Sequence, residues 1–254
     1  MVTTLIVLAH PDGRSFNGAW AEATQKACVN AGGTGLWSDL IAMSFDPVES
    51  KRHYPQIGYD SVFDALRAQE EAAKGNLLPA DVAIEIEKMR QADRIIFHFP
   101  IWWFAPPAVL KGWFDRVLVH GELHSVKQRF DAGQFRGKKV LFCVTTGSSK
   151  AESSYDGNEG DIQMLLWPAA YALRYLGFSV LKPEIVNGVH GYHIGKECTA
   201  LQARLRRILH GQESLIGNLD KRPLIQFNLD TDFNEDGKLR PDRPSYSQFI
   251  RHEP

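Results

Sequence analysis

Continuous apolar runs separated by helical stretches constrain the fold of this chain more than any other feature of its sequence. The runs at 4–9 (TLIVLA), 94–99 (RIIFHF) and 139–145 (KVLFCVT) are rich in β-branched and aromatic residues. Runs of this kind are typical of strands that are buried on both faces, as in a parallel sheet. Shorter runs at 35–40 and 178–181 supply two more strands. The sequence therefore predicts five strands of one parallel sheet.

Helical stretches lie between these strands, at 15–30, 81–91, 107–119 and 161–176. The first ends beside Gly32, as expected where a helix C-terminus requires a positive φ. Strands and helices that alternate in this way indicate βαβ units. A turn directly after the first strand favours an α/β fold of the flavodoxin-like, doubly wound type. We expect its five parallel strands in the order 2-1-3-4-5, with helices on both faces.

Two segments lie outside this predicted core. The first, at about 46–78, contains two prolines and a helical stretch at 61–73, and the second, at 219–254, is polar and contains prolines. Neither has enough apolar residues for a core of its own. We therefore expect one domain at 1–218 that includes the first segment as an insertion, followed by an extended C-terminal arm.

Composition excludes several classes of protein. The chain has 29 Lys and Arg against 30 Asp and Glu, and a net charge of -1 disfavours general binding of nucleic acid. No apolar run approaches the ~20 residues of a membrane span, and the first residues lack the basic start of a signal peptide. Cys28, Cys143 and Cys198 are scattered, which predicts neither disulfides nor a metal site and favours a cytoplasmic location. Cys143 lies in mid-strand, as a small core residue would.

Three loops, at 10–17, 100–107 and 145–155, follow the carboxyl ends of the first, third and fourth predicted strands. In an open parallel sheet, ligands bind at this edge, where the strand order reverses. The first loop, HPDGRSFN, lacks both the dinucleotide fingerprint and the P-loop lysine. Its Arg14 and Ser15, next to the free amides of a helix start, could bind an anion. Alternatively, Ser15 only caps the helix.

The second loop, FPIWWFAPP, contains Trp102, Trp103 and Phe104 in succession. Three adjacent aromatic residues in a loop cannot all face one core, so we expect them to pack against a flat polycyclic ligand. Their backbone N–H groups could also donate to a ring that becomes anionic on reduction. A dimer interface would favour the same residues. The third loop begins TTGSS and adds hydroxyl donors and glycine. Together the three loops predict a flavin site.

These loops also carry a family resemblance. The segments LIVLAHPDGRSFN, FPIWWFAPPAVLKGWFDRVL and VTTGSSK resemble, in the same order, the NAD(P)H:quinone oxidoreductases of DT-diaphorase type, and the likeness extends over roughly residues 3–185. The resemblance implies a homodimer that binds FAD, with FMN less favoured. It also implies a two-electron, ping-pong reduction of quinone-like acceptors by NAD(P)H.

By position, the resemblance implies which residues contact the cofactor. His10, Phe16 and Asn17 would lie at the FAD phosphates and adenine, and Asp115 would face the cofactor of the partner subunit. Residues 101–104 would lie along the isoalloxazine, and 145–148 at its polar edge. With the helix-start serine and the first residue of the second loop added, the predicted contacts are His10, Ser15, Phe16, Asn17, Pro100, Ile101, Trp102, Trp103, Phe104, Thr145, Thr146, Gly147 and Ser148.

The chain departs from the family pattern at the residues that support hydride transfer. Where the family has a Tyr and a His, this chain has Ser153 and Glu159, with Tyr155 two residues further on. We take Tyr155 and Glu159 as the candidate catalytic residues, because a small shift of the loop would restore Tyr155 as a donor. A carboxylate would repel an anionic reduced flavin. Glu159 is therefore equally well explained as a solvated loop residue.

Substrate contacts are expected from Trp103, Phe104 and His124. An aromatic pair that lines the family's substrate pocket is absent, and His124 stands near one of its positions. Two other functions fit the same fold. One is a regulatory flavoprotein that binds a partner, such as a potassium-efflux system, through the C-terminal arm. The other is a one-electron carrier, which the weak acidic balance and the aromatic loop disfavour.

Two further motifs have a simpler structural explanation. The segment 232–237 (DFNEDG) matches the opening of a calcium loop, but Arg243 stands where a bidentate Glu is needed and Pro241 blocks a following helix. We expect a polar turn there. The basic stretch 204–207 (RLRR) alternates with leucine, which predicts an amphipathic surface helix.

Overall fold

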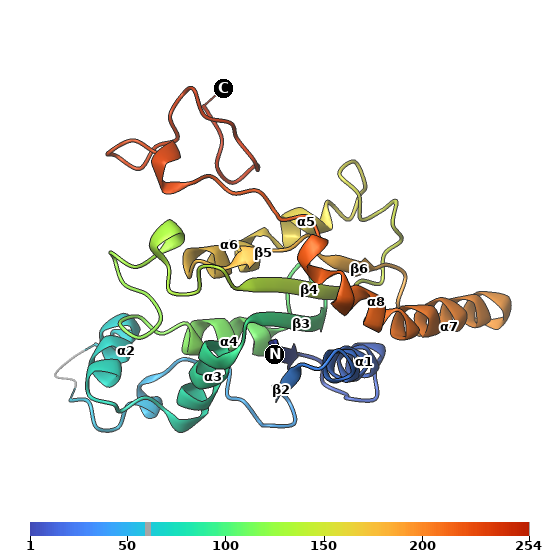
Figure 1. Ribbon diagram of the computed structural model, residues 1–254, viewed down its shortest axis with the longest axis horizontal. Helices are drawn as coiled ribbons and strands as arrows, with labels where there is room; N and C mark the ends of the chain where they lie inside the picture. The colour runs from blue at the N-terminus through green and yellow to red at the C-terminus, as the bar shows by residue number, and fades with distance from the viewer. Residues whose placement is uncertain (59–61, 254) are drawn as a thin grey trace.

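The computed structural model describes residues 1–58 and 62–253, and its central sheet lies between two layers of helices (Figure 1). The strands are β1 (Thr3–Leu8), β2 (Thr34–Asp39), β3 (Arg94–Pro100), β4 (Lys139–Thr145), β5 (Ser179–Val180) and β6 (Glu184–Val186). All pairs are parallel and follow the order β2-β1-β3-β4-β5, while β6 also pairs with β4. The predicted flavodoxin-like order 2-1-3-4-5 is confirmed.

The last sheet position differs from the prediction of a single strand at 178–181. β5 pairs with the first two residues of β4, and β6 pairs with the last three, Cys143 to Thr145. Pro183 lies between β5 and β6, and a proline has no N–H to donate to a ladder. The edge is therefore split into two short strands. β6 was missed because three residues that begin with a glutamate are too short to form an apolar run.

Eight α-helices are present in the described part of the chain. They are α1 (Phe16–Asn30), α2 (Ala65–Lys74), α3 (Ala80–Gln91), α4 (Ala108–Val117), α5 (Ile162–Leu165), α6 (Trp167–Tyr175), α7 (Gly195–His210) and α8 (Gln212–Gly217). α1, α7 and α8 cover one face of the sheet, and α3 to α6 cover the other (Figure 1). Helices on both faces are as predicted.

Two helix predictions need correction. The helix expected at 161–176 is two helices that meet at Leu166, because Pro168 in the first turn of α6 cannot donate to the carbonyl of the preceding turn. The helix expected at 61–73 begins at Ala65, where the Asp64 side chain accepts from the Arg67 N–H. Ser61, the start expected from the sequence, lies outside the described residues.

Alternate residues of the strands pack on opposite helical layers. Leu5 and Val7 of β1 belong to the core under α3 and α4, whereas Ile6 and Leu8 pack beneath α1 against Ala21. All of them are at most 1% exposed. Because both faces are covered, Leu5 to Ala9 are all buried, which explains the continuous apolar character of this run. Cys143 is likewise fully buried, and burial raises the pKa of its thiol well above the ordinary value.

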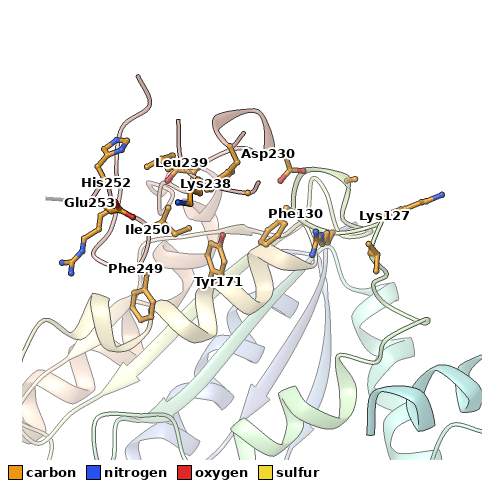
Figure 2. Close-up of a pocket in the computed structure, with 17 residues that line it drawn as sticks. Lys127, Phe130, Tyr171, Asp230, Lys238, Leu239, Phe249, Ile250, His252 and Glu253 are labelled. Atoms are coloured by element: carbon orange, nitrogen blue, oxygen red, sulfur yellow. The ribbon is translucent and has the colours of Figure 1, made fainter. Parts of the chain in front are cut away.

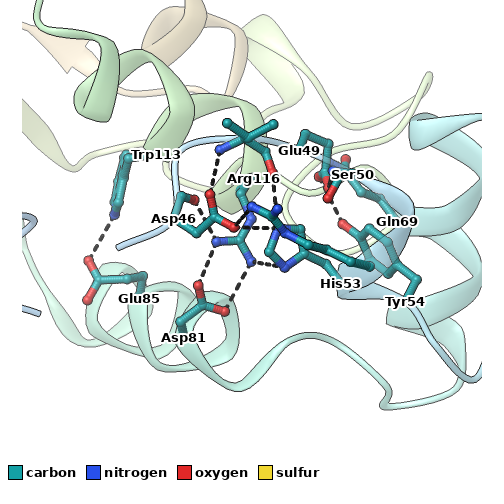
Figure 3. Close-up of polar contacts among 12 residues, drawn as sticks. Asp46, Glu49, Ser50, His53, Tyr54, Gln69, Asp81, Glu85, Trp113 and Arg116 are labelled. Atoms are coloured by element: carbon teal, nitrogen blue, oxygen red, sulfur yellow. Dashed lines mark hydrogen bonds and ion pairs between the residues drawn. The ribbon is translucent and has the colours of Figure 1, made fainter. Parts of the chain in front are cut away.

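The predicted insertion at 46–78 is attached to the core by a buried arginine (Figure 3). The Arg116 guanidinium on α4 is fully buried and donates to both carboxylate oxygens of Asp81 on α3, at 2.6 and 3.2 Å. It also donates to the Asp46 carbonyl at 2.8 Å. Gly112 allows the close approach, because a Cβ there would lie 2.2 Å from the Pro47 oxygen. One side chain therefore joins three segments of the chain.

The C-terminal arm has no α-helix among its described residues, only the 3-10 turns at Leu219–Lys221 and Asp230–Asp232. It crosses α6 and the loop at 126–132, and encloses a cavity of about 940 Å³ with Phe130 and Tyr171 (Figure 2). Its tip is the polar turn expected at 232–237, in which Asn234 Oδ1 accepts from the Asp236 and Lys238 N–H groups. The division of the chain at 218 remains a prediction.

Two further features bear on the sequence predictions. The basic stretch at 204–207 lies in α7, where Leu205, Ile208 and Leu209 pack on the core. Arg206 and Arg207 face outward, as predicted, whereas Arg204 is half-buried and donates to the Asn187 carbonyl. In the described ranges, no helix is long and apolar enough to span a membrane.

We expect loss of the Asp81 carboxylate to be strongly destabilising, because it leaves a fully buried guanidinium with no compensating charge. Asp81→Ala should lower the free energy of unfolding by about 3 kcal/mol in urea denaturation. The control is Arg52→Ala, because Arg52 pairs with Asp46 at the surface with 63% of its side chain exposed. That change should cost less than about 1 kcal/mol. Equal effects of the two variants would contradict the role given to the buried pair.

His98 on β3 should make stability depend on pH. Its ring is fully buried beside Trp20, with a centroid distance of 5.2 Å, and burial lowers its pKa from 6.5 to about 3. Below about pH 6.5 the unfolded chain binds a proton that native His98 does not. The free energy of unfolding should therefore fall by up to about 1.4 kcal/mol per pH unit from this group as the pH drops toward 3.

The variant His98→Leu should flatten this dependence. Urea denaturation of the native chain and of the variant between about pH 7 and about pH 5 measures the two slopes, and the native chain should show the steeper fall. Identical slopes would show that His98 does not contribute.

Candidate active site

The three predicted loops lie together at the carboxyl edge of the sheet, because β1, β3 and β4 are neighbours. The Ile101 N–H donates to the Thr145 carbonyl at 2.8 Å, which joins the second and third loops. Asn17 Nδ2 donates to Thr145 Oγ1 at 2.9 Å, which ties the first helix to the third loop. The rings of His10 and Trp102 are 5.8 Å apart. The site predicted from three separate segments is therefore one place in the structure.

Residues 102–105, which we name the aromatic turn, form a tight hairpin. The Trp102 N–H donates to the Ala105 carbonyl at 3.0 Å, and the Ala105 N–H donates back at 3.1 Å. The two residues between them, Trp103 and Phe104, have φ values of 49° and 61°. This left-handed conformation costs a residue with a Cβ roughly 1–2 kcal/mol, and strain of this kind concentrates at functional sites.

The aromatic turn presents a large apolar surface to solvent. Trp103 is 94% exposed, Phe104 52% and Trp102 45%. These rings do not lie in the subunit core, as they would if their role were only to pack the fold. A contiguous exposed aromatic surface at the ligand-binding edge of a sheet is typical of a binding site.

Two adjoining cavities, of about 650 and 480 Å³, lie beside the aromatic turn. The residues that line both are Ile101, Trp103, Thr146, Gly147 and His190. The larger cavity is also lined by Phe104, Ser148, Glu152, Ser153, Glu159, Ile162 and Leu165, and the smaller by Pro100, Trp102, Thr145 and Val189. One wall is therefore aromatic and the other is built of hydroxyl, glycine and carboxylate groups.

The residues present fit a flavin. Gly147 has open space where a Cβ would stand, so a planar ring can approach the backbone there. The hydroxyls of Thr146 and Ser148 lie 2.8 Å apart and can donate to ring carbonyls. Asn17 Oδ1 is buried without a hydrogen-bond partner in the described part of the chain. A buried polar atom without a partner at this place is a candidate ligand contact.

The start of α1 is suited to a phosphate. Ser15 caps the helix by accepting from the Gly18 N–H at 3.2 Å, and the first N–H groups of any helix have no partner within it. Arg14 is not directed at this site, because it donates to Asp12 at 2.7 Å. Hydrogen bonds from Arg14 lower the pKa of Asp12 to about 2. The Phe16 ring packs on Trp20, 5.3 Å away, on the core side of the helix.

The structure places the two candidate catalytic residues differently. Glu159 lines the larger cavity, but Tyr155 is 84% exposed and is not part of the lining. A turn in which the Ser153 N–H donates to the Ser149 carbonyl directs Ser153 inward, where its hydroxyl contacts that of Ser148. In this structure Ser153 takes the inward position and Tyr155 does not, so a donor role of Tyr155 stays a prediction.

His124 is not brought to the aromatic turn within one chain. It lines a separate cavity of about 310 Å³ with Tyr171 and Tyr175. Its Nε2 lies 3.0 Å from the Leu118 carbonyl, and burial lowers its pKa. Asp115 faces outward on α4 and pairs with Lys111. Contact of His124 with substrate therefore stays a prediction, and it would require a second subunit whose His124 lies beside the aromatic turn of this one.

Sequence reasoning missed His190, which lines both cavities. It follows β6, so the rule that places ligands at the carboxyl ends of strands applies to it as well. Because β6 was not recognised, its loop was not considered. A Gly-Val-His segment after a short extended run was the available signal.

Comparison with known proteins agrees with the geometry. Residues 2–209 match a family model described as a flavodoxin-like fold. The chain is 41% identical over 187 residues to NAD(P)H dehydrogenase [quinone] 1 of Rattus norvegicus, which covers 73% of this chain and 68% of the relative. It is 38% identical to ribosyldihydronicotinamide dehydrogenase [quinone] of Pongo abelii, over 71% of this chain and 79% of the relative.

A solved structure is similar over nearly the whole chain. A putative quinone reductase from Klebsiella pneumoniae superposes with a TM-score of 0.84 at 27% identity and covers 95% of both chains. Fold and site thus define an α/β protein of the flavodoxin-like class. The chain belongs to the NAD(P)H:quinone oxidoreductase family within that class, as its sequence predicted, and it is an enzyme of the oxidoreductase type.

The left-handed conformation of the aromatic turn predicts that Trp103→Gly will not destabilise the protein without ligand. The side chain is almost fully exposed, so little packing is lost, and glycine relieves the positive φ. Chemical denaturation should show an unchanged free energy of unfolding or a gain of up to about 1 kcal/mol. Tyr192→Gly, at a ring 90% exposed but without positive φ, is the control and should show no gain. A large loss in Trp103→Gly alone would contradict the assignment of strain.

Proposed function

We propose that this chain is an FAD-dependent NAD(P)H:quinone oxidoreductase. The observation that carries the proposal is the exposed, strained aromatic turn, which faces a wall of hydroxyl and glycine groups at the carboxyl edge of the sheet. The names of the relatives from Rattus norvegicus and Klebsiella pneumoniae support a quinone as the acceptor. A bound flavin supplies hydride chemistry at its N5, so that NAD(P)H, H⁺ and quinone become NAD(P)⁺ and hydroquinone.

The chain's own residues bind and orient the reactants. Trp103 and Phe104 provide the ring surface, and their backbone N–H groups are available as donors. Thr146, Gly147 and Ser148 provide donors and close approach at the polar edge of the ring. The hydroxyls of Thr146, Ser148 and Ser153 form a chain of hydrogen bonds that offers a donor to an acceptor carbonyl.

The start of α1 suits a phosphate of either flavin cofactor, because the helix amides at Phe16 and Asn17 are oriented by the backbone. We choose FAD over FMN because the resemblance of the sequence to the NAD(P)H:quinone oxidoreductases of DT-diaphorase type implies it. The two cavities beside the aromatic turn adjoin and share part of their lining, so NAD(P)H and the quinone would use the same space in turn, which gives ping-pong kinetics. We include in the proposal a cytoplasmic homodimer, in which a second chain covers part of the exposed aromatic surface.

The purified protein should be yellow and should release FAD on denaturation, with about one flavin per chain. Absorbance and mass of the released cofactor test this directly, and initial rates at varied NAD(P)H and quinone should give parallel double-reciprocal lines. Release of FMN would correct the cofactor and leave the reaction class standing. A colourless protein that takes up neither flavin would contradict the proposed function.

A further inference from the structure

The larger cavity beside the aromatic turn, in which an acceptor would stack on the proposed flavin, has an acidic lining. Its lining includes the carboxylates of Glu152 and Glu159, and none of the lining residues described there is a Lys or an Arg. His190 is the one side chain of this lining that can carry a positive charge. The cavity therefore has negative net charge whether or not His190 is protonated.

Glu152 is held as an anion by the loop that bears it. Its Oε2 accepts from the Ser149 N–H at 2.8 Å, and the Ser149 hydroxyl interacts with the same side chain. These hydrogen bonds lower its pKa from the ordinary glutamate value. A carboxylate fixed in this way remains charged at neutral pH.

Glu159 is kept next to Glu152 but has no partner for its own charge. The Glu159 N–H donates to the Glu152 carbonyl at 2.9 Å, so the backbone holds the two residues side by side. Within residues 1–58 and 62–253, no hydrogen bond or ion pair engages the Glu159 side chain. A lining carboxylate without a partner is available to a ligand.

His190 does not neutralise this wall. Its ring stacks on His193, with centroids 3.9 Å apart and planes 14° from parallel. His193 in turn lies 3.0 Å from the Gly188 carbonyl through Nε2 and 3.7 Å from Glu197 through Nδ1. The carboxylate that pairs with these two rings is Glu197, which does not line the cavity. Neither Glu152 nor Glu159 forms an ion pair with His190 or His193 in the described part of the chain.

We propose that Glu159, with Glu152, makes this enzyme prefer planar acceptors that carry a positive charge, such as an aromatic ring with a quaternary ammonium substituent. The inference rests on the proposed function and names the acceptor class of the same site. Both carboxylates are exposed to solvent, so an opposite charge a few ångströms from each should raise kcat/KM by no more than about fivefold for each. An anionic acceptor loses a similar amount.

The test compares three naphthoquinones that share one ring: the neutral compound, a sulfonate and a trimethylammonium derivative. With saturating NAD(P)H, the holoenzyme should reduce the cation at least about tenfold more efficiently than the sulfonate, measured as kcat/KM. The ratio should shrink as salt is added, because screening weakens exposed charges. Glu159→Gln should lower the ratio of the cation to the sulfonate severalfold, whatever its effect on the rate with the neutral quinone. Glu22→Gln, an exposed glutamate on α1 outside the cavity, is the control for net charge and should leave the ratio unchanged.

Binding without turnover gives a second measurement. At mildly alkaline pH, the oxidised holoenzyme should quench the fluorescence of N-methylacridinium more strongly than that of neutral acridine. Glu159→Gln should remove most of this difference. A cation-to-sulfonate ratio of kcat/KM near one, or a ratio that Glu159→Gln does not change, would overturn the inference. Efficient reduction of the neutral quinone in the same experiment would leave the proposed function intact. Absence of flavin and of any quinone reduction would instead refute the proposed function itself.

Discussion

The parallel pairing of β3 between β1 and β4 is the constraint on which the site depends. Because all three strands run in the same direction, their carboxyl ends meet at one edge, and loops separated by more than a hundred residues become neighbours. The hydrogen bonds from Ile101 and Asn17 to Thr145 are direct consequences of this pairing. The register in turn depends on side chains buried on both faces, since a slip of one residue would exchange the two layers.

Stability and function are separated in space. The core under α3 and α4 is closed by fully buried groups such as Arg116 and by Trp113, whose Nε1 donates to Glu85 at 2.9 Å (Figure 3). The aromatic turn is the opposite case, because Trp103 and Phe104 are exposed and have positive φ. A rigid sheet can hold such a strained turn in place, which is the arrangement expected when a loop must present its rings to a ligand.

The polar wall gives the site its individual chemistry. Ser153 and Glu159 line the larger cavity, and His190 reaches both cavities from another strand end. In the proposed function, the aromatic wall and the start of α1 would bind the cofactor, whereas the two carboxylates would face the acceptor. A flavin can keep its reaction while the protein around the acceptor changes, because the cofactor supplies the hydride chemistry and the protein supplies orientation and charge.

The sequence by itself determined the sheet order, the two helical layers and the three site loops, since buried parallel strands leave long apolar runs and their ends share one edge. Tertiary structure decided what such runs do not encode. β6, and with it His190, depends on pairing with β4 that only three residues make. The outward position of Tyr155 depends on hydrogen bonds within its own loop, and the place of His124 on packing against Tyr175. These outcomes rest on contacts between distant or irregular segments, which have no periodicity to read along the chain.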